Sequence, residues 1–157
     1  GVVTRLTNNP AADLSPDWSH QNGRLAFQSN RGGANEEIYT MAADGSDVRR
    51  LTTNPNGDSN PSWSPLGDRL VFWGTREQQA LYTMRADGSN ITLLVPQALR
   101  PNAPAWSFVG ETIVFSGYRA GSGHSEVFRI EANGSGLVLL TFNEVDFDYA
   151  PDWLPGW

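Results

Sequence analysis

Cysteine is absent from this chain of 157 residues. Its absence excludes disulfide bonds, thiolate metal sites and a cysteine nucleophile, although it does not identify a cellular compartment. The sequence also has no run of about 18 apolar residues, the length that a membrane-spanning helix requires. There is no lysine-rich run, and the formal net charge is −6, so we expect neither a membrane span nor a nucleic-acid-binding face.

Signatures of catalysis are missing as well. The sequence contains no Gly-x-Ser-x-Gly nucleophile elbow and no His-Glu-x-x-His metal motif. Its two histidines, His20 and His124, lie in a predicted turn and a predicted Gly-Ser loop, and the sequence pairs neither with a nucleophile. We therefore predict that the chain is not an enzyme, and we assign it no catalytic residue.

Tryptophan, by contrast, is abundant and regularly spaced. The pattern Pro-x-Trp occurs four times, with tryptophans at positions 18, 63, 106 and 153, which are 45, 43 and 47 residues apart. A period in the low forties is typical of a repeat protein.

Short β-strand patterns fill the space between these tryptophans. Each repeat has three apolar runs. They span residues 24–27, 37–41 and 48–52 in the first repeat, 69–72, 80–84 and 91–95 in the second, and 112–115, 126–130 and 137–141 in the third. The last two runs of each repeat are separated by Asp44-Gly45-Ser46, Asp87-Gly88-Ser89 or Asn133-Gly134-Ser135, which are hairpin turn sequences. Runs of four to six residues between Gly, Pro, Asn and Asp predict strands rather than helices.

The predicted fold is therefore all-β, with four-stranded antiparallel β-propeller blades. We expect residues 1–157 to form a single partial propeller with complete blades at 16–52, 61–95 and 104–141, and partial flanking strands at 5–7 and 151–153. Three blades do not close a ring, because propellers have about four to eight. Three arrangements are open: a fragment of a longer propeller, two copies that complete one ring, or a partner that covers the open ends.

The repeat resembles the WD40-like β-propeller repeat of the TolB family. The first repeat carries the motifs Pro16-Asp17-Trp18-Ser19, Gly23-Arg24-Leu25-Ala26-Phe27, Ser29-Asn30-Arg31, Ile38-Tyr39-Thr40-Met41 and Asp44-Gly45-Ser46. The third repeat departs furthest, with Phe108-Val109-Gly110 in place of the usual turn. The resemblance implies a periplasmic or extracellular protein that binds other proteins of the cell envelope. Similar propellers also occur in prolyl oligopeptidase-type peptidases and in polysaccharide lyases.

An aspartate five residues before the tryptophan is a candidate metal ligand. It occurs as Asp13, Asp58 and Asp148, whereas the third repeat has Pro101 there. A partial ring of carboxylates near a central channel would attract a cation, and calcium prefers such oxygen ligands. The alternative is a local cap in which each aspartate accepts hydrogen bonds from its own loop. We predict no other cofactor.

Arginines and tryptophans complete the candidate residues. Arg31, Arg76 and Arg119 recur in step with the repeat, so we expect them to bind loop carbonyls or a carboxylate of the same or a neighbouring blade. Trp73 and Trp157 fall outside the repeat pattern. Because interfaces are enriched in tryptophan, we predict that Trp73, Trp153 and Trp157 contact a partner.

The leading functional hypothesis is a non-catalytic protein-binding scaffold, a propeller subunit or fragment in a larger assembly. Its partners would be other proteins, including a second copy of the chain or a larger envelope complex. Two alternatives are the propeller portion of a larger hydrolase or lyase, and a cation- or carbohydrate-binding module.

Overall fold

Three four-stranded antiparallel sheets make up the computed structural model, which describes residues 1–119, 121, 123–142 and 147–153. Blade 1 contains β1 (Asp13–Ser19), β2 (Arg24–Ser29), β3 (Glu37–Ala42) and β4 (Arg49–Arg50). Blade 2 contains β5 (Asp58–Trp63), β6 (Arg69–Thr75), β7 (Gln79–Arg85) and β8 (Thr92–Val95). Blade 3 contains β9 (Asn102–Trp106), β10 (Thr112–Tyr118), β11 (Ser125–Glu131) and β12 (Val138–Leu139). The predicted all-β fold with three four-stranded antiparallel blades is confirmed.

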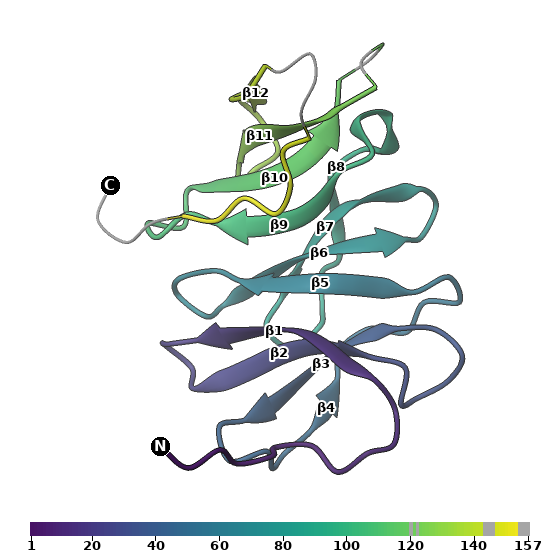
Figure 1. Ribbon diagram of the computed structural model, residues 1–157, viewed down its shortest axis with the longest axis vertical. Coiled ribbons are helices and arrows are strands. Elements are labelled where there is room, and N and C mark those ends of the chain that lie inside the picture. Colours follow the sequence, from purple (N-terminus) through teal and green to yellow (C-terminus); the bar gives the residue numbers. More distant parts are fainter. Residues whose placement is uncertain (120, 122, 143–146, 154–157) are drawn as a thin grey trace.

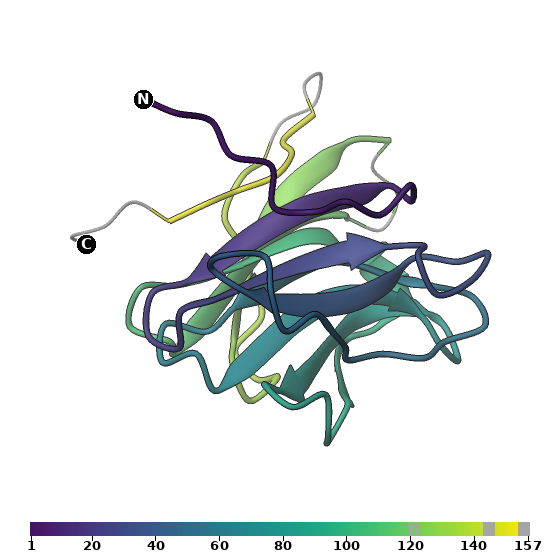
Figure 2. The same ribbon diagram turned by 90° about the horizontal axis from the view of Figure 1, so that it is seen from below.

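The blades follow one another along the long axis of the molecule (Figure 1). Within each blade the strands pair in sequence order, so β1, β5 and β9 are the first strands of their sheets and we call them the inner strands. Seen from below, the sheets fan out instead of stacking as parallel plates (Figure 2). A short 3-10 helix, η1 (Gln97–Leu99), is the only helix among the described residues, and it is far too short to cross a membrane. Residues 5–7 and 151–153 belong to no strand.

A bulge interrupts every inner strand just before its proline. Ser15, Asn60 and Ala103 have φ values of 48°, 50° and 47°, and Ala150 has 48° at the same position of the fourth repeat. Pairing with the next strand shifts register at this point in all three blades. Such bulges bend a strand and redirect the side chains that follow. The sequence pattern predicted that each inner strand begins at its proline. The structure shows the start three residues earlier in blades 1 and 2, and two residues earlier in blade 3.

The same apolar contact recurs between neighbouring blades. Ala26 and Ile38 of blade 1 form one buried cluster with Trp63, Phe72 and Tyr82 of blade 2. Blades 2 and 3 repeat this contact with the corresponding residues Val71, Leu81, Trp106, Phe115 and Phe128. Blades 2 and 3 thus each present an aromatic front face to the aliphatic back face of the blade before them, and Trp63 and Trp106 pack between blades.

The front face of blade 1 has no such neighbour in the described structure. Phe27, Tyr39 and Met41 form a cluster of their own. Trp18 is 38% exposed, whereas its counterpart Trp63 is only 5% exposed. No further blade packs against this face in the described structure. Phe27, Tyr39 and Met41 are nevertheless only 2–5% exposed, and Leu6 and Thr7 of the N-terminal segment line a hollow together with Phe27 and Met41.

A buried carboxylate fastens the third strand of blade 1 to the chain that leaves the blade. Glu37, which is 2% exposed, accepts hydrogen bonds from Arg50 Nη2 at 2.9 Å, Thr52 Oγ1 at 2.6 Å and the Asn54 amide at 2.6 Å. Glu126 occupies the same position in blade 3 and accepts one from Thr141 Oγ1 at 2.9 Å. Burial of such a group is tolerable because its partners replace water.

Arginine and aspartate of the same blade pair at the opposite end of the inner strands from the tryptophans. Arg31 Nη2 lies 2.7 Å from Asp13 Oδ1, and Arg76 Nη2 lies 2.5 Å from Asp58 Oδ2. Each arginine also covers aromatic rings of its blade, for example Phe27 at 4.9 Å. The predicted role of these two arginines, binding a carboxylate of the same blade, is confirmed.

The pKa values of these two aspartates, Asp13 and Asp58, are shifted in opposite directions. Burial favours a raised pKa for Asp13, but hydrogen bonds from Ser29, Arg31 and Thr7 outweigh it and lower the pKa. Burial raises the pKa of Asp58, with the Asn54 hydrogen bond and the charge of Arg76 opposing it. The difference follows from burial, since Asp58 is fully buried.

Replacement of Glu37 tests the buried carboxylate. Glu37→Ala leaves three donors without their acceptor, so the free energy of unfolding should fall by about 2–4 kcal/mol in urea denaturation. The control Glu111→Ala removes an exposed glutamate and should change it by less than about 0.5 kcal/mol. Equal, small effects of both changes would contradict the role of Glu37.

The pH dependence of stability tests the aspartates. A lowered pKa means that Asp13 stabilises the fold above the unfolded value of 3.8 and loses this effect as the pH falls through its folded pKa. A raised pKa means that Asp58 loses its contribution as the pH rises above 3.8. As pH rises from about 3 to about 7, Asp13→Asn should therefore become less stable relative to the unsubstituted chain, and Asp58→Asn more stable. Slopes of the same sign would overturn the assignment.

Candidate functional site

A cavity of about 530 Å³ opens at the end of the inner strands where each chain turns into its second strand. All four in-phase tryptophans line it: Trp18, Trp63, Trp106 and Trp153. We call this cavity the mouth. The fold produces it directly, because the tryptophan is the last residue of β5 and β9 and the next-to-last of β1, and the inner strands lie side by side.

The rim of the mouth is apolar and exposed. Leu66, in the turn after β5, is 74% exposed, and Phe108, in the turn after β9, is 68% exposed. His20 and Gln21 border the mouth from the corresponding turn of blade 1. Large apolar side chains gathered at the edge of a cavity are typical of binding sites for proteins or ligands.

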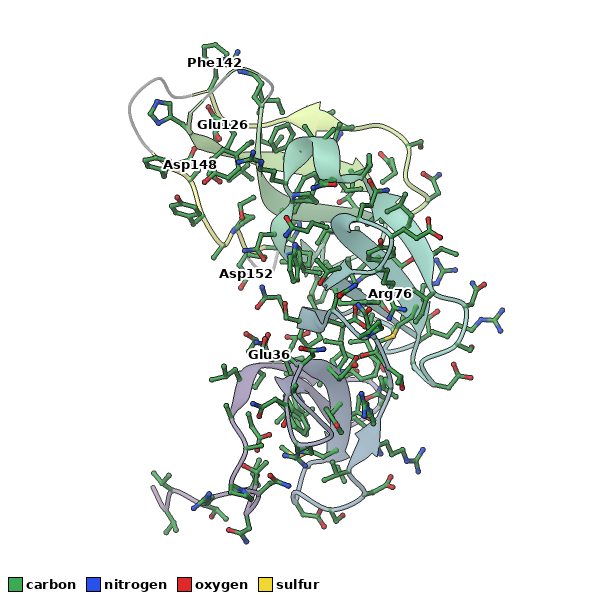
Figure 3. The ribbon with its side chains drawn as sticks, turned by 90° about the vertical axis from the view of Figure 1, so that its right-hand side faces the viewer. Glu36, Arg76, Glu126, Phe142, Asp148 and Asp152 are labelled. Atoms are coloured by element: carbon green, nitrogen blue, oxygen red, sulfur yellow. The ribbon has the colours of Figure 1, made fainter. Side chains whose placement is uncertain are left out.

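Two carboxylates lie in the wall of the mouth. Asp17 and Asp152 both line it, and both also line a second hollow of about 290 Å³ along the inner strands, beside the bulges and prolines. Asp17 accepts a hydrogen bond from the amide of Trp63 in the next blade. In Figure 3, Asp152 lies on the segment that returns from the end of blade 3 toward the inner strands.

The environment of Asp17 disfavours its charge. Burial raises the pKa of Asp17 above its ordinary value, and the negative charge of Asp152 acts in the same direction. Amide donors of Trp63 and Trp18 oppose this rise without cancelling it. A positive group placed between the two carboxylates would relieve their repulsion.

Two of the tryptophans around the mouth are also part of the core. Trp63 and Trp106 are more than nine-tenths buried as whole residues, and their indole Nε1 atoms are buried as well. The mouth is therefore lined by other parts of these two side chains.

The predicted metal ligands do not assemble in one place. Asp13 and Asp58 are each engaged by an arginine of their own blade. Asp148 lies at the end of blade 3, where its amide donates to the Ser125 carbonyl at 2.9 Å, near Glu126 and Phe142 (Figure 3). Within the described part of the chain, no three His, Cys, Asp or Glu residues are grouped so that they could hold a metal ion. Calcium binding stays a prediction.

The predicted contact tryptophans have different surroundings. Trp73 is half-buried and packs against the cluster between blades 2 and 3. Trp153 lines the mouth. Trp157 lies outside the described residues.

Asp17, Leu66 and Phe108 were not singled out by the sequence as site residues. The signal was nevertheless present for two of them, because leucine and phenylalanine occupy turn positions where blade 1 has polar residues.

Aromatic residues also cluster away from the mouth, at the far end of blade 3. Phe147 and Tyr149 stack with ring centroids 5.8 Å apart, and His124 contacts Phe147 at 5.1 Å. A hydrogen bond with Tyr118 raises the pKa of Tyr149, and burial acts in the same direction.

Solved structures with the same fold span more than one kind of protein. TolB from Acinetobacter baumannii matches with a TM-score of 0.70 and 21% identity over 81% of this chain and 32% of that chain. A putative TolB from Agrobacterium tumefaciens matches with a TM-score of 0.71 and 23% identity over 85% and 50%. An oligogalacturonate lyase from Vibrio parahaemolyticus matches with a TM-score of 0.64 and 10% identity over 86% and 42%. This chain thus spans half or less of each of these structures, and the likeness shows a common fold.

The sequence itself gives a more specific match. A comparison with curated proteins found none that matches. The family model of the TolB beta propeller domain, however, matches residues 1–155, which is nearly the whole chain. The motifs that carry the resemblance recur in each blade and build both the contact between blades and the mouth. On this evidence the chain belongs to the TolB β-propeller family.

Proposed function

We propose that this chain is a non-catalytic scaffold that binds another protein through the mouth, as a subunit or fragment of a larger propeller assembly. The observation that carries the proposal is the combination of four tryptophans around one cavity with the exposed Leu66 and Phe108 at its rim. Tryptophan and exposed apolar residues around a pocket are the composition of interface hot spots. Membership of the TolB family supports a place in the periplasm or outside the cell.

The apolar rim serves binding rather than folding in this proposal. Side chains as exposed as those of Leu66 and Phe108 contribute little to the core. Their position at turn tips leaves them free to enter a partner surface. A rim of this kind around a deeper aromatic pocket matches the arrangement in which a central anchor is surrounded by residues that exclude water.

The front face of blade 1 supports the assembly part of the proposal. Trp18, Phe27, Tyr39 and Met41 match the residues with which blade 2 packs on blade 1, but no further blade packs on them in the described structure. Phe27, Tyr39 and Met41 are buried, whereas Trp18 and the nearby Leu14 are 38% and 48% exposed. A further blade, from a second copy or from a larger propeller, would cover these partly exposed side chains, whose exposure is unfavourable for a lone monomer.

The rim can be tested by substitution. The double change Leu66→Ser and Phe108→Ser should leave the free energy of unfolding within about 1 kcal/mol and reduce capture of a binding protein from an envelope extract by about tenfold or more. Quantitative mass spectrometry of the captured proteins measures the loss. The control Leu137→Ser alters a leucine that is 49% exposed and does not line the mouth, so capture should persist. Capture that is equal for all three proteins would refute binding through the mouth.

The native mass tests assembly. We expect the purified chain to have a mass above the 17.2 kDa of one copy in light scattering, because Leu14 and Trp18 leave apolar surface exposed at the front of blade 1. Leu14→Glu places a charge at a side chain that is 48% exposed and should shift the population toward one copy. A monomer that keeps its fold without any partner would contradict the assembly part of the proposal and leave the rim result unaffected.

A further inference from the structure

A separate hollow lies outside the mouth, between strands β6 to β8 of blade 2 and the turn that follows β11 in blade 3. Its volume is about 260 Å³, and it shares no lining residue with the mouth. Two arginines and two asparagines are among the residues that line it: Arg69, Arg85, Asn90 and Asn133. We call this hollow the arginine pocket. None of the described residues that line it carries a carboxylate.

The two arginines of the pocket are direct neighbours. The pairing of β6 with β7 places Arg69 opposite Arg85, and like charges at such positions repel each other. Neither guanidinium group forms a hydrogen bond with the part of the chain that the structure describes, and the ion pair of Arg69 is long, with 4.0 Å between its Nε and Asp68 Oδ2. Asp68 does not line the pocket, and its other carboxylate oxygen accepts from Ser64 Oγ at 2.8 Å. An anion between the two guanidinium groups would relieve their repulsion.

Blade 1 shows what the corresponding arginine binds. Arg24 is the counterpart of Arg69 in the repeat, and its side chain is 20% exposed, compared with 55% for Arg69. Arg24 Nη1 donates to Asp47 Oδ2 and Arg24 Nη2 donates to the backbone carbonyl of Asp47, both at 2.8 Å. Thr40 Oγ1 accepts from the same guanidinium group at 3.2 Å. One arginine thus holds both the carboxylate and the carbonyl oxygen of a single aspartyl residue.

Blade 2 keeps the arginine and the threonine of this arrangement but lacks the aspartate. Thr83, the counterpart of Thr40, lines the arginine pocket. Asn90 occupies the position of Asp47, and the two residues have nearly the same left-handed φ, 55° and 51°. An asparagine carries no charge, so Arg69 has lost the carboxylate that Arg24 binds.

Other departures from the repeat change the charge of the pocket in the same direction. Three replacements each make it more positive than the matching place between blades 1 and 2: Asn90 for Asp47, Asn133 for Asp87, and Arg85 for Ala42. One replacement acts the other way, because Thr92 stands where blade 1 has Arg49, which pairs with Asp47. Two positive charges therefore line the arginine pocket, whereas the matching positions between blades 1 and 2 carry two charges of each sign: Arg24, Arg49, Asp47 and Asp87.

We infer that the arginine pocket binds an aspartyl residue of a protein partner, with its carboxylate between Arg69 and Arg85 and its backbone carbonyl against Arg69. The partner thus supplies from outside what Asp47 supplies within blade 1. The inference goes beyond the proposed function, because this site lies apart from the mouth and uses none of its residues.

The arrangement distinguishes an aspartyl residue from simpler anions. Phosphate, sulfate and acetate offer charge, but they have no backbone carbonyl at the distance from the carboxylate that Asp47 provides for Arg24. A guanidinium group is planar and has several donors, so it can hold both oxygen atoms at once. The net charge of −6 opposes an acidic ligand at long range, but salt limits this repulsion to about 8–10 Å under physiological conditions. The two guanidinium groups in the pocket therefore decide binding.

Short peptides give a direct test. The probes are acetyl-Gly-Asp-Gly-amide and acetyl-Gly-Asn-Gly-amide, which has the same shape without the charge, in a buffer free of other carboxylates and of phosphate. The chain is labelled with 15N, and the side-chain amide signal of Asn133, assigned from its loss in Asn133→Asp, reports on the pocket. We expect the aspartyl peptide to shift this signal saturably, with a Kd on the order of 1–10 mM. The asparaginyl peptide should bind about tenfold more weakly, and acetate and inorganic phosphate about threefold more weakly.

Substitutions locate the site. Asn90→Asp restores the aspartate of blade 1, so it should fill the pocket from within and weaken binding of the aspartyl peptide by about tenfold or more. Arg69 and Arg85 are exposed, and Arg69→Gln and Arg85→Gln should each fold normally and weaken binding by about three- to tenfold. The control Arg100→Gln removes an exposed arginine that does not line the pocket and should leave the affinity unchanged. Thermal unfolding of every variant is measured in parallel.

The outcomes decide this inference separately from the proposed function. Equal affinity for the two peptides, no shift of the Asn133 signal at about 20 mM aspartyl peptide, or an unchanged affinity of Asn90→Asp would each overturn the inference. Phosphate or acetate that bound as tightly as the aspartyl peptide would reveal an adventitious anion site only, and would overturn it as well. Capture of a protein through Leu66 and Phe108 is measured on variants outside this pocket, so either result can stand without the other.

Discussion

Packing of the aromatic face of one blade on the aliphatic face of the blade before it is the contact on which the rest of the structure depends. A phenylalanine or tyrosine ring buries about 150–250 Å². At about 25 cal/mol per Å², each ring contributes at most about 6 kcal/mol, so Phe72 and Tyr82 on Ala26 and Ile38 outweigh any single polar contact in the fold. The same contact sets the spacing of the inner strands, and this spacing brings four tryptophans around one cavity.

The tryptophans therefore have two roles that use different parts of the side chain. The ring systems of Trp63 and Trp106 belong to the clusters between blades, whereas their Nε1–H groups have no acceptor among the described residues. Phenylalanine would satisfy the packing without leaving a buried donor. Because these nitrogen atoms are buried, only other parts of the two side chains line the mouth.

Local patterns allowed the sequence to predict the blades but not the mouth. Asp44-Gly45-Ser46 predicts its turn because the Gly45 φ of 84° and the bond from the Ser46 amide to Asp44 depend on neighbouring residues only. The bulge at Ser15 has no such signal, since a positive φ before proline is contrary to local preference and is imposed by the sheet. Asp17 and Asp152 hold the same position in the first and fourth repeats, but their common place in the wall of the mouth depends on how the blades between them are arranged, which no local pattern encodes.

The arginine and aspartate series shows why phase alone does not identify function. Residues in step with the repeat, such as Asp58 and Arg76, satisfy each other within one blade, so their recurrence reflects the fold. Residues that depart from the repeat pattern, such as Leu66 and Phe108, remain at the surface because no repeated partner exists for them. In a repeat protein, the departures from the pattern are therefore better guides to binding than the pattern itself. In this chain those departures, together with the charges of the first and fourth repeats, meet at the mouth.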